Sequence, residues 1–117
     1  MDIKIWTCCE KIRFDYLKNL KEEFHLVFFS KPDIIVVNES IFFEKKMKRR
    51  FIKKIKRYDD AIRVYVSKSN IIPDLNIFDY AIYDGDVSFF SNRVILCHSN
   101  DMFLDEILKI FQKKRDT

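Results

Sequence analysis

Short runs rich in Ile, Val and aromatic residues recur along the chain, and longer segments with apolar residues at helical spacing lie between several of them. The runs are residues 3–9 (IKIWTCC), 25–30 (HLVFFS), 32–37 (PDIIVV), 61–67 (AIRVYVS), 79–84 (DYAIYD) and 93–98 (RVILCH). Strand-length runs that alternate with helical segments are typical of α/β sheets. The pattern predicts an α/β fold, a single Rossmann-like domain with a mostly parallel sheet flanked by helices.

Three intervening segments have the apolar spacing of amphipathic helices. They are residues 12–24, 39–57 and 99–115. The second segment places Phe43, Met47 and Phe51 on one face. Ser40 is its expected N-cap, and Glu44 is expected in its first turn. Each segment is therefore predicted to be a helix that packs its apolar face on the sheet.

Two of the strand-like runs, 25–30 and 32–37, have only a turn between them. Parallel neighbours cannot be joined by so few residues. These strands are therefore either antiparallel partners or not adjacent in the sheet. The length of 117 residues is that of one compact domain, so a single domain over residues 1–117 is expected.

Gly85 is the only glycine in the sequence. A G-x-G-x-x-G or Walker loop is therefore excluded, and no cofactor is predicted. The cysteines, Cys8, Cys9 and Cys97, lack the spacing of a zinc site, so we expect buried thiols at strand ends and no metal. The amino terminus has no apolar run long enough for a signal peptide or a membrane span, which predicts a cytoplasmic protein.

Polar residues follow the predicted parallel strands, at the sheet edge where ligands of such folds bind. They are Cys9, Glu10, Asn38, Glu39, Ser67, Lys68, Ser69, Asn70, Asp84 and Asp86. A carboxylate at this edge can act as a general base if burial or a like charge raises its pKa. The structural alternatives are that Glu39 simply begins a helix and that residues 84–86 (DGD) form an ordinary turn.

Residues 64–84 carry a more specific pattern: a strand, a polar loop, a Pro-Asp turn and the run FDYAIYD. This stretch resembles α-1,3-fucosyltransferases (glycosyltransferase family ten), in which a strand, a T-G-E-N loop, a Pro-Asp/Asn-Phe-Asn turn and a D-Y-A-I-G-F-D strand follow in order. The matching residues are Val64, Tyr65, Asn70, Pro73, Asp74, Asn76, Phe78, Asp79, Tyr80, Ala81, Ile82 and Asp84, with Arg93 before the next strand. A looser similarity extends from the first run to about His98.

The resemblance implies the N-terminal, acceptor-binding lobe of a GT-B glycosyltransferase, a family that transfers fucose from GDP-fucose to a glycan acceptor such as lipopolysaccharide. The donor lobe is expected to be missing or separately encoded, so the chain is a truncated or split enzyme that is inactive alone. Aligned residue by residue, the family's T-G-E-N loop falls on Ser67, Lys68, Ser69 and Asn70. Ser69 therefore occupies the catalytic-base position, and no catalytic residue is assigned. Glu39 or Asp84 would have to substitute for the base.

The resemblance gives the turn residues a structural role. Pro73 fixes a backbone angle, and the side chains of Asp74 and Asn76 can satisfy turn amides. We expect this turn to lead Tyr80 and Ile82 into a buried strand, with Asp79 as a further structural residue of the motif.

A basic segment suggests a different function. Residues 45–57 contain nine Lys or Arg and no acid, in a chain with a net charge of +4. The alternative function is a non-enzymatic basic α/β module that binds nucleic acid or an anionic membrane surface. Nucleic acid is the less favoured partner, because the resemblance implies a sugar-transferring enzyme at the inner leaflet of a membrane. The membrane would be contacted at its inner face by Lys45, Lys46, Arg49 and Lys53. A solvated helix face accounts for the same charges.

Overall fold

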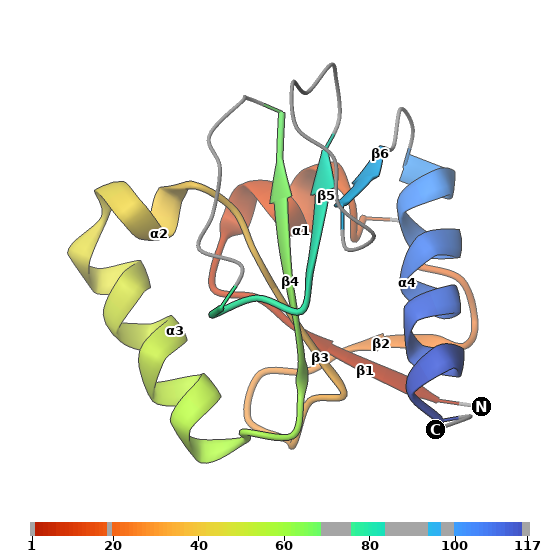
Figure 1. Ribbon diagram of the computed structural model, residues 1–117, viewed down its shortest axis with the longest axis horizontal. Helices are drawn as coiled ribbons and strands as arrows, with labels where there is room; N and C mark the ends of the chain where they lie inside the picture. Colours follow the sequence, from red (N-terminus) through yellow and green to blue (C-terminus); the bar gives the residue numbers. More distant parts are fainter. Residues whose placement is uncertain (1, 19, 69–75, 84–93, 97–99, 116–117) are drawn as a thin grey trace.

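Six parallel strands form one sheet in the computed structural model, which describes residues 2–18, 20–68, 76–83, 94–96 and 100–115 (Figure 1). They are β1 (Ile3–Trp6), β2 (Phe24–Leu26), β3 (Ile34–Val37), β4 (Ile62–Ser67), β5 (Tyr80–Tyr83) and β6 (Val94–Leu96). The order across the sheet is β2-β1-β3-β4-β5-β6, and every neighbouring pair is parallel. The predicted Rossmann-like α/β class is confirmed.

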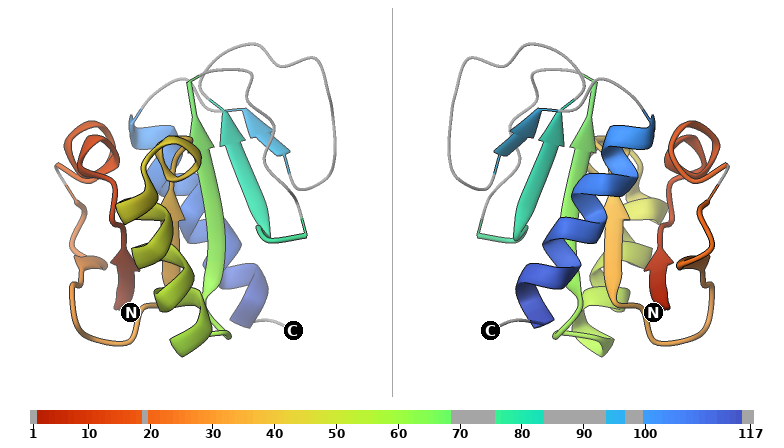
Figure 2. Two further views of the ribbon diagram at one scale, coloured as in Figure 1. Left: turned by 90° about the vertical axis from the view of Figure 1, so that its left-hand side faces the viewer. Right: turned by 90° about the vertical axis from the view of Figure 1, so that its right-hand side faces the viewer.

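Four helices are present in the described residues. They are α1 (Glu10–Asp15), α2 (Ser40–Phe43), α3 (Lys45–Arg57) and α4 (Asn100–Arg115). Figure 2 looks onto the α3 side of the sheet in its left view and onto the α4 side in its right view, so the sheet lies between these two helices. α1 packs against α4, where the ring centroids of Tyr16 and Phe103 are 4.8 Å apart.

The core consists mainly of the strands themselves. All four residues of β3 are completely buried, and so are Ile3 and Ile5 of β1. Strands covered on both faces read as continuous apolar runs, which is why the run IIVV shows no alternation with polar residues. Tyr65 of β4 is the centre of an aromatic cluster, with ring centroids 5.5 Å from Phe78 and 6.2 Å from Tyr83.

The strands β2 and β3 are not adjacent, because β1 lies between them and pairs with both. The second of the two alternatives for this region is therefore correct. The connection is held at Asp33, whose carboxylate accepts a hydrogen bond from the backbone N–H of Lys4 at 2.8 Å.

The predicted helix over 12–24 is wrong beyond Asp15. α1 has six residues, and Tyr16 is its C-cap. Tyr16 and Leu17 are buried as their spacing predicted, but they lie in the turn after the helix. Apolar spacing thus located the buried residues correctly and overestimated the length of the helix.

The predicted helix over 39–57 is broken at Glu44. The backbone of Glu44 is extended, with φ −115° and ψ 110°, and this residue is the N-cap of α3 instead of a first-turn residue. Ser40 is the first residue of α2, and Glu39 takes the N-cap position. The break turns the side chain of Phe43 out of the predicted apolar face, so that it is 70% exposed.

Candidate functional site

The strand order creates a switch point between β1 and β3. The connection after β1 leads to β2 on one side, and the connection after β3 leads to β4 on the other, so the two loops diverge at the carboxyl ends of these strands. Two adjoining cavities there share Lys11, Asn38 and Glu39. The larger has a volume of about 620 Å³, and the smaller, of about 30 Å³, reaches the end of β4. We call them together the carboxyl-edge crevice.

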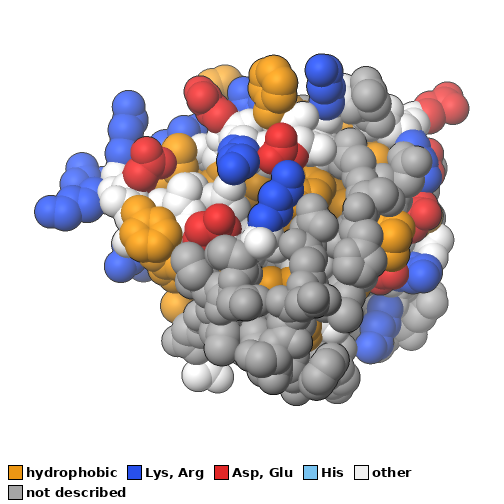
Figure 3. Space-filling view, turned by 90° about the horizontal axis from the view of Figure 1, so that it is seen from above, with side chains coloured by type: hydrophobic (Ala, Val, Ile, Leu, Met, Phe, Trp, Pro, Cys, Tyr) orange, Lys and Arg blue, Asp and Glu red, His pale blue; other side chains and the backbone are white. Residues whose placement is uncertain are grey.

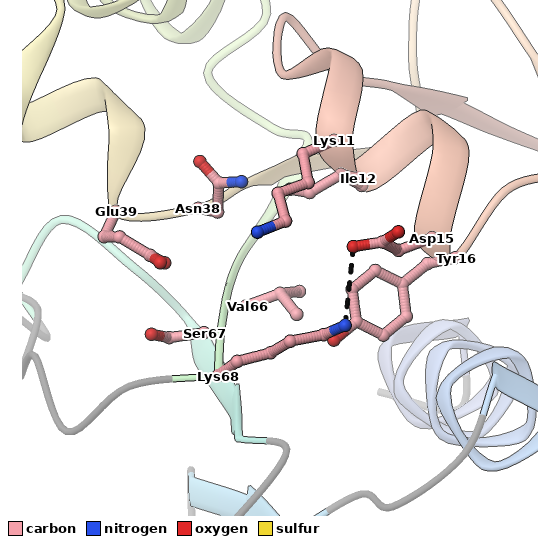
Figure 4. A pocket seen from close by; sticks show the side chains of 9 residues that line it. All are labelled: Lys11, Ile12, Asp15, Tyr16, Asn38, Glu39, Val66, Ser67 and Lys68. Atoms are coloured by element: carbon pink, nitrogen blue, oxygen red, sulfur yellow. Dashed lines mark hydrogen bonds and ion pairs between the residues drawn. The ribbon is translucent and has the colours of Figure 1, made fainter.

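Three elements supply the polar side chains of the smaller cavity (Figure 4). Lys11, Asp15 and Tyr16 come from α1 and its C-cap, Asn38 and Glu39 from the loop after β3, and Ser67 and Lys68 from the end of β4. The Lys68 ammonium lies 3.4 Å from an Asp15 carboxylate oxygen and 5.8 Å from the centroid of the Tyr16 ring. Side chains far apart in the sequence thus converge on one space.

Asn38 fixes the loop that carries Glu39. Its side-chain oxygen accepts a hydrogen bond from the backbone N–H of Ser40 at 2.9 Å and another from the Ser40 hydroxyl. This Asx-type turn holds the backbone at the start of α2. The same hydroxyl lies 3.4 Å from the Cys9 sulfur, which connects the loop after β3 to the loop after β1.

Cys8 and Cys9 are both buried, which confirms the expectation of buried thiols at a strand end, whereas Cys97 lies outside the described residues. The pKa of Cys9 is lowered to about 6, chiefly by its hydrogen bond with the Cys8 thiol and further by the Ser40 hydroxyl, against the opposing effect of burial. The same hydrogen bond, together with burial, raises the pKa of Cys8. Cys9 lines the larger cavity.

Two buried tyrosines lie close to Glu39. Burial raises the pKa of Tyr83 to about 12, and the Glu39 carboxylate adds to that shift. The pKa of Tyr65 is also raised by burial, despite a hydrogen bond with Ser67 that lowers it. Both phenols therefore stay protonated at neutral pH and can act as neutral hydrogen-bond donors.

The charges of the crevice do not suit an anionic ligand. Lys11 and Lys68 are its cations, and Asp15 and Glu39 balance them in the smaller cavity. Glu10 and Glu44 add negative charge to the larger cavity. With amide and hydroxyl groups from Asn38 and Ser67, this arrangement offers donors and acceptors to a neutral ligand rich in hydroxyl groups.

The expectation that ligand-binding residues follow the carboxyl ends of the strands located much of this site. Cys9, Glu10, Asn38, Glu39, Ser67 and Lys68 all line the crevice. Ser69, Asn70, Asp84 and Asp86 lie outside the described residues. Lys11, Asp15 and Tyr16 were missed because they belong to a helix and its C-cap, although the four-residue spacing of Lys11 and Asp15 places them on one helical face.

The motif residues of the turn lie elsewhere. Pro73 and Asp74 are outside the described residues. Asn76 is exposed before β5, at the opposite edge of the sheet from the crevice. The Asp79 carboxylate accepts a hydrogen bond from the backbone N–H of Arg63 at 2.8 Å, which ties the start of β5 to β4. Tyr80 belongs to β5 but is only half-buried.

The predicted membrane-contact residues, Lys45, Lys46, Arg49 and Lys53, are all exposed on α3. No helix in the described part of the chain is long and apolar enough to span a bilayer. Within the same residues, no group of three or more His, Cys, Asp or Glu side chains is arranged to hold a metal ion.

Comparison with protein-family models, with curated proteins and with solved structures finds no significant match to this chain. The resemblance to α-1,3-fucosyltransferases is therefore carried by the sequence motif alone and stays a prediction.

Proposed function

We propose that this protein is the acceptor-side domain of a fucosyltransferase-like glycosyltransferase, and that the carboxyl-edge crevice binds the glycan acceptor. The observation that carries the proposal is the convergence of polar and charged side chains, with more carboxylates than cations, at the switch point of the sheet. The motif between β4 and β5 is the second support, because the loop expected to approach the acceptor begins at Ser67 and Lys68, which line this crevice.

In this proposal each group has a defined task toward a sugar. The Glu39 carboxylate accepts a hydrogen bond from a sugar hydroxyl. The Asn38 side-chain NH2 group is a donor, because its oxygen already accepts from Ser40, and the Ser67 hydroxyl can donate or accept. The Tyr16 ring supplies apolar surface beside the Lys68 stem. Glu39 is also the residue we assign to receive the hydroxyl proton of the acceptor, in place of the family's base at the Ser69 position.

The test is a titration of the protein with N-acetyllactosamine, followed by amide chemical shifts. We expect saturable shifts at the ends of β3 and β4, and a Kd raised about tenfold or more in Glu39→Gln, because a hydrogen bond to a charged group contributes about 1.5–3 kcal/mol. Glu22→Gln is the matched control, because Glu22 is exposed and outside the crevice. Absence of saturable shifts, or an equal loss in both variants, would refute the proposed site.

GDP-fucose is the informative second ligand. The crevice has two cations and four carboxylates, so it repels a diphosphate, and no saturable binding of GDP-fucose at the carboxyl-edge crevice is expected. Tighter binding of GDP-fucose than of the disaccharide at these residues would reassign the crevice to the donor.

A further inference from the structure

The outer side of α3 carries a dense group of cations. All nine Lys and Arg residues of the helix are exposed except Lys54, which is half-buried. None of them forms an ion pair with a described residue. Repulsion within such a group disfavours the helix unless an anionic partner neutralises it. The positive charge on this side of the sheet therefore favours binding to a partner with an anionic surface.

Exposed aromatic side chains flank these cations. Phe43 precedes α3 and is 70% exposed, and Phe29, in the connection between β2 and β3, is 93% exposed. That connection runs beside the last turns of α3, where the Lys54 ammonium donates a hydrogen bond to the backbone carbonyl of Phe28 at 3.2 Å. The left view of Figure 2 shows both elements on the same side of the sheet.

An apolar groove borders the same helix. Ile52, Ile77 and Phe42 line it, its volume is about 250 Å³, and Lys48 and Arg63 also belong to its lining. From above, Lys and Arg side chains project from the edge formed by α2 and α3, with hydrophobic side chains next to them (left in Figure 3). Apolar surface and cations are thus interleaved on one side of the molecule.

The spacing of the aromatics distinguishes a bilayer from nucleic acid. Lys45 follows Phe43 by two residues, Lys54 contacts the Phe28 backbone, and the two lysines are separated by a rise of about 14 Å along α3. Successive bases of a strand stack at about 3.4 Å, so these rings do not form a continuous stacking platform. Separate aromatic side chains around the cations of α3 are typical of a surface that binds an anionic bilayer, because aromatic rings and Lys side chains both partition into the bilayer interface.

We propose that α3, with Phe29 and Phe43, is a docking surface for a bilayer that contains anionic phospholipids. The cations of α3 contact the headgroups, and the two phenylalanines enter the interfacial region. The docking surface shares Phe43 and Met47 with the carboxyl-edge crevice, but none of the α3 cations lines the crevice, so their contribution to membrane binding can be tested separately from sugar binding.

The test is cosedimentation with vesicles of 30% phosphatidylglycerol in phosphatidylcholine and with vesicles of phosphatidylcholine alone, with retained native circular dichroism as a condition for every variant. The triple variant Lys46→Gln, Arg49→Gln, Lys53→Gln should bind the anionic vesicles about 100-fold more weakly than the unmodified chain. The control Lys18→Gln, Lys109→Gln, Lys113→Gln removes the same charge from exposed positions outside α3 and should bind normally. Equal weakening in both variants would overturn the proposal, since it would show a response to net charge alone.

The aromatic contribution has its own controls. Phe29→Ser and Phe43→Ser should each weaken vesicle binding about tenfold, the order expected for an apolar side chain that leaves the interface. Phe14→Ser should have no effect, because Phe14 is 72% exposed on α1 and does not belong to the proposed docking surface. Full binding by Phe29→Ser and Phe43→Ser would overturn the proposed insertion.

Nucleic acid is the competing partner. A fluorescently labelled 20-nucleotide single strand and a duplex of the same length, titrated at the same salt concentration, should bind more weakly than the anionic vesicles. Failure to sediment with anionic vesicles, or tighter binding of either oligonucleotide, would overturn the membrane assignment. The triple variant should retain the disaccharide-induced shifts at β3 and β4, which separates this proposal from that of the sugar site.

Discussion

Removal of the Tyr65 side chain should destabilise the protein severely. Tyr65 is completely buried in β4, and its ring contacts Phe78, Tyr83 and Phe42. Truncation of a buried aromatic residue to Ala costs about 3–5 kcal/mol. A domain of this size has a total stability of about 5–15 kcal/mol, so Tyr65→Ala should lose a large part of it.

The assay is urea unfolding followed by the fluorescence of Trp6, which is the only tryptophan in the sequence and is buried in β1. With an m-value of about 2 kcal/mol/M, the midpoint for Tyr65→Ala should fall by about 2 M. Tyr65→Phe keeps the ring and removes the hydroxyl group, which forms a hydrogen bond with Ser67, so it should cost about 1 kcal/mol.

Tyr80→Ala is the matched comparison, because it deletes the same side chain from the neighbouring strand. Tyr80 is half-buried, so this variant should lose clearly less stability than Tyr65→Ala. If Tyr65→Ala and Tyr80→Ala unfolded at the same urea concentration, or if Tyr65→Ala unfolded like the unmodified chain, the aromatic cluster would not be the stabilising centre of this region.

Three further outcomes are expected. The pKa of Tyr83 is raised in the folded protein to about 12, so the contribution of Tyr83 to stability is complete below pH 10 and is lost as the pH rises from 10 through 12. Urea titrations at pH 8 and pH 11 should show a lower unfolding free energy at pH 11. An equal unfolding free energy at both pH values would contradict this prediction. Phe103→Ala in α4 should cost about 3–5 kcal/mol in thermal unfolding, whereas the exposed Lys109→Ala should cost little. Lys68→Ala should change the unfolding free energy by less than about 1 kcal/mol, because the Lys68 side chain in the ion pair with Asp15 is 51% exposed. A larger loss would show a structural role for Lys68.

The strands could be predicted from the sequence because covered parallel strands need continuous apolar side chains. The runs around Ile34 and Ile62 gave β3 and β4 within a few residues. The break at Glu44 could not be predicted in this way, because Phe43, Met47 and Phe51 fit a single helical stripe whether or not the helix is continuous. Only packing shows that Phe43 leaves the stripe.

The candidate site was predictable where it depends on strand ends. Glu39 and Ser67 lie where a parallel order places them, because β3 and β4 are neighbours that point the same way. Lys11 and Asp15 could not be placed without knowing that α1 begins directly after β1 and turns its Lys11 side toward β4. A prediction restricted to residues that immediately follow strands therefore underestimates the contribution of α1 to the carboxyl-edge crevice.

The strand order also bears on how the protein assembles as it leaves the ribosome. β1 is an interior strand, and both of its neighbours, β2 and β3, are complete by Val37. From β3 onward, each new strand adds to the open edge in the order of synthesis, β4, then β5, then β6. A nascent chain can therefore extend its sheet one strand at a time without waiting for distant segments. The same order leaves an unpaired parallel edge exposed at every stage, and that edge is where a stalled nascent chain would be most open to aggregation or to capture by a chaperone.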